Sequence, residues 1–348
     1  MNFASDNVYG VDPRILAAMV AANEGTARSY SYDNLTAAAR ARLAQVFERE
    51  VAVHLVTTGT AANGLALSAA TPPYGAVICH AEAHIAVDEC NAPEMFIGGG
   101  KLIGIHGRGG KITPAEVANV LKGFIRGEHD PKPATISITN ASEAGTVYTP
   151  AEVRALADLA HGRGMKLHMD GARFANAVAS LGCSPAALTW QAGVDIMSFG
   201  GTKNGGMMLE AVVIFDAALA RDFNYRQMRG GQLVSKSRFL AAQMLAYLEH
   251  DLWLENARAA NALARTLAAR LAQVPGVRLG HRVEANEVFA VLPRAAHEAW
   301  QAAGAVYYDW LPDGLAEKPG PDEVFARFVL SHATPPAAVE RFLTLAQK

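Results

Sequence analysis

Short apolar runs of strand length alternate, along much of the chain, with segments in which apolar residues recur at helical spacing. Residues 35–49 have this helical spacing and are followed by the strand-like run EVAVHLV. The alternation continues through ATISIT, a helix that a TPAEV cap signal opens, and the strand KLHMD. Strands and helices that alternate at this period predict a parallel, doubly wound α/β sheet with right-handed crossovers.

The pattern changes near residue 245. A long Ala/Leu/Arg helix over 252–273 is followed by the shorter strand-like pieces GVRLG, EVFAVLP, AVYYDWL and ARFVLSH and by a closing helix, which predicts an antiparallel α+β domain. At the other end, little apolar pattern is present apart from a helix that Pro13 opens. We therefore expect an N-terminal arm (1–34), a large domain (35–244) and a small C-terminal domain (245–348).

Composition narrows the class of protein. The chain has 348 residues, enough for a large core and a second domain, and its formal net charge of −2 gives no case for nucleic acid or an anionic membrane. No apolar run reaches transmembrane length, and the start of the chain lacks a signal-peptide pattern. The three cysteines form no disulfide framework, so we expect a reducing compartment, the cytoplasm.

Two predicted strands end in residues that carry chemistry. KLHMD ends at Asp170, and DIMSF is followed by a glycine pair and Lys203. Because open parallel sheets bind ligands at the carboxyl ends of their strands, both side chains would reach one crevice. A carboxylate facing a lysine in a glycine-lined pocket suits pyridoxal phosphate (PLP), which the lysine binds covalently while the carboxylate keeps the ring nitrogen protonated. A solvated ion pair on a loop would explain the same two residues.

The stretch TTGTAANGLALSAA, residues 57–70, reads as a strand end, a turn and a helix. Free N–H groups at the helix start, with the hydroxyls of Thr58 and Thr60, would bind a phosphate. A helix that is merely capped by threonine would show the same residues. The spacing matches neither a P-loop nor a dinucleotide-binding fingerprint.

The segment from Cys79 to Cys90 also contains His80, Glu82 and His84. It lacks the helical H-E-x-x-H pattern, and no second Cys/His group follows at zinc-like spacing, so we expect no metal. His84 is instead a candidate to stack on a flat cofactor ring, and a structural histidine is the alternative.

Several cations leave alternatives open. Arg327 lies in an apolar strand, where it needs an anion, and either a substrate carboxylate or a buried salt bridge would serve. A basic loop carries Arg226, Arg229, Lys236 and Arg238. These would be solvated charges in a monomer, whereas in a dimer some would reach the phosphate of a partner subunit.

Taken in order, the loop TGTAAN, His84, HMDGARFANA and SFGGTKNGG resemble the fold type I PLP enzymes, and specifically the low-specificity L-threonine aldolase and phenylserine aldolase family. The resemblance extends from FASDN to ARFVLS. It implies a mostly parallel seven-stranded sheet, a small C-terminal domain, and a carbon–carbon lyase that cleaves β-hydroxy-α-amino acids to glycine and an aldehyde. It also implies a homotetramer, a dimer of dimers with active sites at the dimer interface.

On the cofactor side, the resemblance implies that Lys203 binds PLP, that Asp170 pairs with the ring nitrogen, and that Arg173 lies near the phenolic oxygen. His84 would stack on the ring. The residues implied to bind the phosphate are Thr58, Gly59, Thr60 and, from a partner subunit, Lys236.

On the substrate side, the resemblance implies that Ser5 and Arg327 hold the α-carboxylate, and Tyr30 matches a tyrosine of an early family motif. Glu143, in NASEAG, stands where many relatives carry a histidine near the substrate hydroxyl, so we expect it in the substrate site. We expect His84, directly or through a water, to handle the hydroxyl proton, because imidazole has a suitable pKa.

Other functions remain as alternatives. A PLP enzyme of the same fold that catalyses β-elimination or transamination would release a keto acid rather than glycine and an aldehyde. A metal-dependent lyase or hydrolase that uses the segment from Cys79 to Cys90 would lose its activity to chelators. A non-enzymatic interaction protein would need neither Asp170 nor Lys203.

Overall fold

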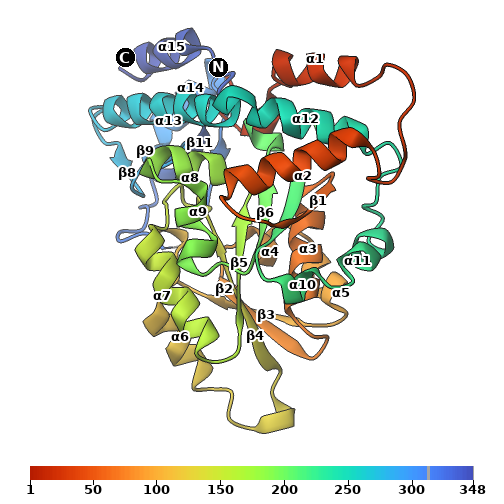
Figure 1. Cartoon of the computed structure of the whole chain (residues 1–348). Coiled ribbons are helices and arrows are strands. Elements are labelled where there is room, and N and C mark those ends of the chain that lie inside the picture. The colour runs from red at the N-terminus through yellow and green to blue at the C-terminus, as the bar shows by residue number, and fades with distance from the viewer. Residues whose placement is uncertain (312–313, 348) are drawn as a thin grey trace.

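The computed structural model describes residues 1–311 and 314–347, which form two sheets and the helices around them (Figure 1). The large sheet has seven strands in the order β1-β7-β6-β5-β4-β2-β3, and the small sheet has four in the order β10-β11-β9-β8. The strands of the large sheet are β1 (Ala52–Val56), β2 (Gly75–His80), β3 (Lys101–Ile105), β4 (Lys132–Thr139), β5 (Lys166–Gly171), β6 (Ile196–Gly200) and β7 (Glu210–Ile214). Those of the small sheet are β8 (Arg278–Leu279), β9 (Glu287–Pro293), β10 (Tyr308–Asp309) and β11 (Glu323–Val329).

Helices cover both faces of the large sheet and one side of the small sheet (Figure 1). The helices before β5 are α1 (Pro13–Ala21), α2 (Asn34–Val46), α3 (Gly59–Ala70), α4 (His84–Val87), α5 (Ala92–Ile97), α6 (Pro114–Leu121) and α7 (Pro150–His161). Those after β5 are α8 (Phe174–Leu181), α9 (Pro185–Leu188), α10 (Ala217–Ala220), α11 (Phe223–Arg229), α12 (Arg238–Leu248), α13 (Leu252–Leu271), α14 (Arg294–Ala302) and α15 (Pro336–Ala346). Across these residues, no helix combines the length and the apolar character that crossing a membrane requires.

Helix starts follow the signals in the sequence. Each TPAEV segment forms a complete capping box, in which the threonine accepts a hydrogen bond from the main-chain N–H of the glutamate three residues on and the glutamate side chain accepts from the threonine N–H. The helix predicted to open at Pro13 does so, with Asp12 as its N-cap. These local signals place α1, α6 and α7 without any knowledge of the tertiary structure.

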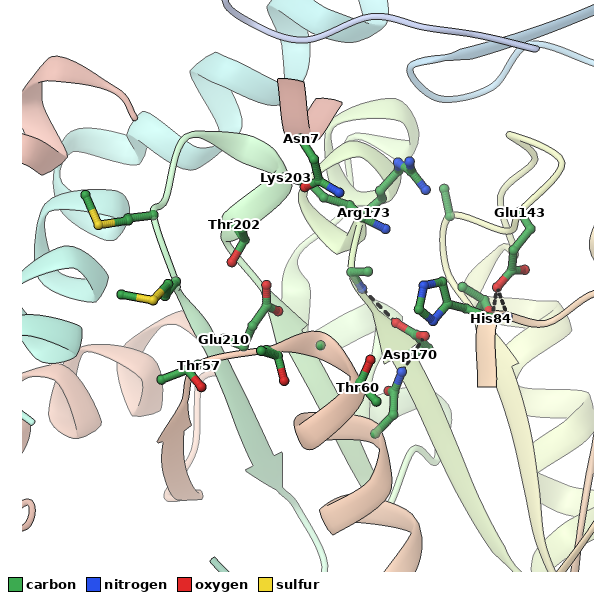
Figure 2. A pocket seen from close by; sticks show the side chains of 18 residues that line it. Asn7, Thr57, Thr60, His84, Glu143, Asp170, Arg173, Thr202, Lys203 and Glu210 are labelled. Atoms are coloured by element: carbon green, nitrogen blue, oxygen red, sulfur yellow. Dashed lines mark hydrogen bonds between the residues drawn. The ribbon is translucent and has the colours of Figure 1, made fainter. Parts of the chain in front are cut away.

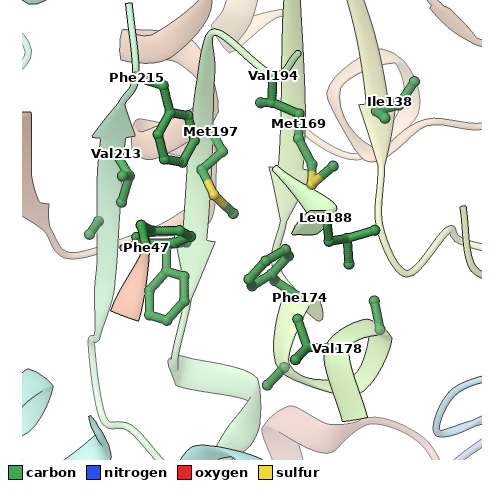
Figure 3. Close-up of a cluster of buried hydrophobic side chains, with 14 of the residues drawn as sticks. Phe47, Ile138, Met169, Phe174, Val178, Leu188, Val194, Met197, Val213 and Phe215 are labelled. Atoms are coloured by element: carbon green, nitrogen blue, oxygen red, sulfur yellow. The ribbon is translucent and has the colours of Figure 1, made fainter. Parts of the chain in front are cut away.

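Alternate residues of the central strands face two hydrophobic layers. Ile196 of β6 packs with residues of α3, whereas the next residue, Met197, packs on the opposite face. That second layer includes Phe47, Phe174 and Phe215, whose rings lie between the sheet and the helices that cover it (Figure 3). Both faces are therefore buried, as is typical of a doubly wound sheet.

The predicted mostly parallel sheet is confirmed, and β7 is the strand that runs against its neighbours. The connection from β6 to β7, residues 201–209, contains only the short 3₁₀ turn η5 (Thr202–Asn204). A parallel crossover needs about a dozen residues or more, so this connection reverses the chain instead. The same short turn carries Lys203.

The C-terminal part is antiparallel throughout its small sheet, as predicted from its short strands. The start of the arm packs against it. The N–H of Phe3 donates to Val306 O at 2.7 Å, and Phe3 O accepts from Val329 N at 2.8 Å. These bonds bring the following turn, η1 (Asp6–Val8), against η5. The domain boundaries at residues 34 and 244 stay predictions.

Candidate active site

A cavity of about 480 Å³ lies at the carboxyl ends of β4, β5 and β6 (Figure 2). Its walls come from η1, the start of α3, the start of α4, the loop after β4, the segment after β5, and η5. The sequence-predicted residues that line it are Thr58, Gly59, Thr60, His84, Glu143, Asp170, Arg173 and Lys203. The topology therefore brings most of the predicted site together.

Asp170 is the penultimate residue of β5, and hydrogen bonds hold both oxygens of its carboxylate. Oδ1 accepts from the N–H of Ala172 at 2.9 Å, and Oδ2 accepts from Nδ2 of Asn63 at 2.8 Å. Burial opposes its ionisation, but the nearby His84, the Ala172 N–H and Lys203 together lower the pKa of Asp170 below its usual value. An ionised carboxylate at this position is a suitable partner for a protonated ring nitrogen.

Lys203 reaches the cavity because β6 ends in close contact with the segment after Asp170. A Cβ atom at Gly200 would lie 2.6 Å from Ala172 O, so the two segments approach this closely only with glycine there. Glu210, the first residue of β7, lies on the same wall, and burial raises its pKa to about 7 although the charge of Lys203 opposes that rise. Figure 2 shows Lys203 beside Asn7 and Arg173.

The first turn of α3 forms one end of the cavity. Thr58 caps the helix by accepting a hydrogen bond from Ala61 N at 3.1 Å. Apart from its chain neighbours and its own helix, no atom of the described residues lies within 4 Å of the position that a Cβ of Gly59 would take, so the space over this turn is open. The free N–H groups and the positive end of the helix dipole suit a phosphate here.

His84 and Glu143 are joined through the main chain. The N–H of His84 donates to Glu143 Oε1 at 2.8 Å, and the hydroxyl of Thr139 donates to the same oxygen at 2.9 Å. The second oxygen, Oε2, is buried and has no hydrogen-bond partner within the described residues. Burial and the nearby charge of Asp170 raise the pKa of Glu143 to about 7. The pKa of Glu143 therefore lies near neutrality.

Arg173 joins three parts of the chain at the cavity wall. Its Nε donates to Asp6 Oδ2 at 2.8 Å, and its Nη2 lies 3.4 Å from Glu287 Oε1 of β9. Burial opposes its charge, but the two carboxylates raise the pKa of Arg173 above its usual value, so the guanidinium stays charged. Asp6 comes from the arm, which explains why the start of the chain belongs to this site.

Ser5 and Arg327 are not among the residues that line the cavity in the described part of the chain. Ser5 caps η1 by accepting from the N–H of Asn7, and it is Asn7 that lines the cavity. Arg327 donates to Ala4 O at 3.2 Å and lies 4.0 Å from the centre of the Trp310 ring, while its buried Nε has no partner within residues 1–311 and 314–347. Their role toward a carboxylate stays a prediction.

Tyr30 and Lys236 also lie outside this cavity. Tyr30 is 47% exposed, and its main-chain N–H donates to Ser235 O. Lys236 follows Ser235 in the segment before α12, and its side chain is exposed. Both predicted roles stay predictions, and the role of Lys236 requires a second copy of the chain.

The sequence did not indicate several residues of the site: Asn7, Asn63, Glu89, Thr202 and Glu210. Asn63 had a usable signal, since it is a polar residue in an otherwise Ala/Leu-rich helix, one turn after Gly59. Glu89 had no such signal, because its burial arises only when α3, α5 and β5 pack together.

The side chains of His84, Glu89 and Asp170 form the group within the described residues that most resembles a metal site, with ligand atoms within 4.8 Å of one another. Nδ2 of Asn63 donates at 2.8 Å to both carboxylates of this group. The two N–H donors of this amide already occupy one oxygen of each carboxylate, which is unfavourable for a cation. Neither Cys79 nor Cys90 belongs to this group.

The donor set fits PLP. A lysine, an ionised carboxylate, an imidazole and an open helix N-terminus surround one cavity, and these are the groups that bind the aldehyde, the ring nitrogen, the ring face and the phosphate of this cofactor.

Comparison with known proteins agrees with this set of residues. The sequence model of the family described as beta-eliminating lyase matches residues 2–295. The chain is 48% identical over 315 residues to the low specificity L-threonine aldolase of Pseudomonas aeruginosa, and 46% identical to that of another Pseudomonas strain, in each case over 90% of both chains. The solved structure of threonine aldolase from Leishmania major matches with a TM-score of 0.92 at 28% identity, covering 99% of this chain and 98% of that one. The family resemblance predicted from the sequence is confirmed.

Proposed function

This chain belongs to the beta-eliminating lyase family, and we propose that it is a PLP-dependent aldolase that cleaves L-threonine, L-allo-threonine and related β-hydroxy-α-amino acids to glycine and an aldehyde. The observation that carries this proposal is the meeting of Asp170, Lys203 and the start of α3 at one cavity, in a chain that is similar to L-threonine aldolases over nine-tenths of its length.

Four parts of the chain would hold the cofactor. Lys203 would bind its aldehyde carbon, Asp170 would keep a proton on its ring nitrogen, and Arg173 would face its phenolic oxygen. The N–H groups and hydroxyls of residues 58–60 would bind its phosphate. When bound, PLP supplies an electron sink for the pair that the broken Cα–Cβ bond leaves on Cα.

The chain's own residues would then orient the substrate and move one proton. His84 Nε2 would take the proton of the β-hydroxyl group, since its Nδ1 is occupied by Glu89. Ser5 and Arg327 would bind the α-carboxylate, and a bidentate guanidinium contact would fix its orientation. Glu143, with a pKa near neutrality, would contact the substrate oxygen from the same wall.

We also propose a homotetramer in a reducing compartment, the cytoplasm. The cations of residues 226–238 lie outside the cavity of their own chain, and Met207 and Met208 at its mouth are 39% and 48% exposed, which supports a partner subunit covering this side. The three cysteines are unpaired and one of them is exposed, which supports a reducing environment. Light scattering measures the assembly. We expect Lys236→Ala to weaken PLP binding, and Lys122→Ala, at an exposed site directly after α6, to leave it unchanged.

The function is tested by supplying PLP and L-threonine to the purified protein and identifying the products. Equal amounts of glycine and acetaldehyde are the expected result. A 2-keto acid with ammonia would instead indicate β-elimination, and a 2-keto acid with amino-group transfer would indicate transamination. Repeating the assay with L-allo-threonine and phenylserine measures the preference for the β-substituent, and a chelator is expected to leave the rate unchanged.

A further inference from the structure

The side chain of Glu89 forms a hydrogen bond with the ring of His84. Its side chain is fully buried, and its Oε1 lies 2.7 Å from Nδ1 of His84 and accepts from Nδ2 of Asn63 at 2.8 Å. The other oxygen, Oε2, is buried with no hydrogen-bond partner within the described residues. A buried carboxylate with only two donors is costly to keep, which points to a use beyond packing.

These contacts decide which nitrogen of His84 faces the cavity. A carboxylate at Nδ1 requires a proton on that nitrogen, so the neutral ring presents an unprotonated Nε2. The main-chain N–H of the same residue is held by Glu143 at 2.8 Å. His84 is therefore fixed at two points, while its side chain remains 35% exposed toward the cavity.

Asn63 connects this pair to the other end of the site. Its amide donates one N–H to Glu89 and the other to Oδ2 of Asp170, both at 2.8 Å. Its position on the first turns of α3 ties both carboxylates to the helix whose N-terminus suits the phosphate. A continuous chain of hydrogen bonds thus runs from His84 through Glu89 and Asn63 to Asp170.

We propose that Glu89 is the positioning residue for His84: it selects the Nδ1–H tautomer, stabilises the imidazolium form, and through Asn63 keeps the ring in register with Asp170. This role rests on the aldolase activity proposed above. It assigns to this chain a carboxylate–imidazole pair in which the imidazole touches the substrate and the carboxylate acts through it.

The charges around His84 agree with this role. Glu89 faces it from the segment after α4, Asp170 from β5, Lys203 from η5 and Glu143 from the loop after β4. The hydrogen bond with Glu89 raises the pKa of His84, burial lowers it, Asp170 raises it and Lys203 lowers it, with a net rise above the usual histidine value. The imidazolium formed in the reaction is thus stabilised mainly by Glu89.

The proton balance of the step is complete. The β-hydroxyl proton moves to Nε2 of His84, and the pair of the O–H bond becomes the second bond of the aldehyde C=O as the Cα–Cβ bond breaks. The pair of the Cα–Cβ bond stays with Cα, which later takes up one proton to give glycine. When the proton on Nε2 is given up, to Cα or to solvent, His84 returns to its starting form with Nδ1–H still directed at Glu89.

The decisive variant is Glu89→Gln, because its amide can keep both existing bonds. The carbonyl of the new side chain can accept from His84 Nδ1 and Asn63 as Oε1 does now, and its NH₂ replaces an oxygen without a partner in the described residues. The change therefore removes the charge and little else. The matched control is Glu94→Gln in α5, a carboxylate that makes no side-chain hydrogen bond within the described residues.

With PLP and L-threonine, we expect Glu89→Gln to lower kcat by about tenfold or more, with KM changed by less than about threefold. The acid limb of the kcat profile should move to lower pH, since the imidazole loses the anion that favours its charged form. Glu94→Gln should match the wild type in rate and profile. A Glu89→Gln enzyme with a wild-type pH profile, whatever its rate, would overturn the proposal.

A second measurement follows the pH dependence of chemical modification at His84 and needs no catalytic turnover. Diethyl pyrocarbonate modifies neutral imidazole, and peptide mass spectrometry of the full chain without added PLP gives the extent at His84 as a function of pH. We expect the midpoint for His84 to fall by more than about half a pH unit in Glu89→Gln. The side chain of His250, 93% exposed, serves as an internal reference and should react identically in both proteins. An unchanged midpoint would contradict the proposal.

The proposed aldolase activity and the proposed role of Glu89 can each be disproved without the other. If the wild-type protein with PLP releases no aldehyde, the proposed activity is wrong, whereas the modification midpoints still test the pair of Glu89 and His84. If the wild type is active and the midpoint does not move, the activity stands and the positioning role of Glu89 is wrong.

Discussion

The two ends of β5 carry the same pair of chemical groups in two different settings. At the amino end, Nε2 of His161 lies 2.9 Å from Oδ2 of Asp195. At the carboxyl end, Nδ1 of His84 lies 2.7 Å from Oε1 of Glu89. Both are histidine–carboxylate contacts of ordinary length, so distance alone does not distinguish them.

Their surroundings do distinguish them. Oδ2 of Asp195 also accepts from the N–H of Leu167 at 2.7 Å, and Lys166 Nζ lies 3.6 Å from the other oxygen. His161 is 42% exposed and lies at the amino ends of the central strands. The amino-end pair thus satisfies the main chain at the start of β5 and contributes to folding.

At the carboxyl end, by contrast, polar atoms are left without partners. Within the described residues, Oε2 of Glu89, Oε2 of Glu143 and Oε2 of Glu210 are buried and make no hydrogen bond. Unsatisfied buried oxygens destabilise a fold, and of these three residues Glu143 and Glu210 line the cavity while Glu89 contacts His84 at its wall. The comparison teaches that the same pair is structural where its atoms are satisfied and functional where they face a ligand.

The largest predicted effect is a loss of activity, caused by a substitution near the carboxyl end of β5. Lys203→Ala should lower the rate of aldehyde release from L-threonine by at least about a thousandfold, because no other lysine lines the cavity among the described residues. A coupled alcohol dehydrogenase assay for acetaldehyde measures the rate. The thermal unfolding midpoint without PLP should stay close to that of the wild type. A variant that keeps a tenth of the activity would rule out Lys203 as the binding lysine.

Asp170→Asn should follow, with a loss of about a hundredfold in kcat. Asparagine is similar in size and can keep the hydrogen bonds with Ala172 and Ser198, although its NH₂ group would lose the bond from Asn63, and it cannot hold a proton on a ring nitrogen. Steady-state kinetics and the visible absorption of bound PLP separate a loss of chemistry from a loss of cofactor. Full occupancy with wild-type kcat would exclude the assigned role of Asp170.

The sequence predicted those two residues because each follows a strand of the sheet, and the carboxyl ends of parallel strands meet. The capping boxes at Thr113 and Thr149 were equally readable, because each depends on residues that are adjacent in sequence. By contrast, Glu89 and Asn63 meet only after α3 has packed against α5, which follows Glu89 in the chain, and no local pattern reports that contact. The reversed direction of β7 also escaped prediction, since it depends on the path of a nine-residue connection rather than on periodicity.

An effect of intermediate size, on stability, is expected at the amino end of β5. Asp195→Asn should reduce the free energy of unfolding by about 1–3 kcal/mol, because its NH₂ group would replace one of the two accepting oxygens and would then face either His161 and the Leu167 N–H or Lys166. Urea unfolding followed by circular dichroism measures the change. The kcat per bound PLP and the acid limb of its pH profile should match the wild type, in contrast to Glu89→Gln. A shifted profile would remove the distinction between the two pairs.

The smallest effect concerns Asp216, which extends the amino-end network. Its Oδ2 lies 2.5 Å from Lys166 Nζ, and its Oδ1 accepts from Ala218 N at 2.9 Å. Burial opposes its ionisation, but Lys166 and the Ala218 N–H lower the pKa of Asp216 below its usual value. A carboxyl with a lowered pKa in the folded state stabilises the protein above its unfolded pKa, and this contribution is lost as the pH falls through the folded pKa.

We therefore expect Asp216→Asn to cost less than about 1 kcal/mol at pH 7, because the ion pair is partly exposed and the asparagine oxygen can still accept from Ala218 N. The difference from the wild type should remain constant down to about pH 5 and shrink below about pH 4, where the wild-type carboxyl also takes up a proton. Unfolding midpoints measured across this range check the sign. A difference that grows on acidification would mean that Asp216 is protonated in the folded protein, and the amino end of β5 would then contain an unsatisfied carboxyl like those around the cavity.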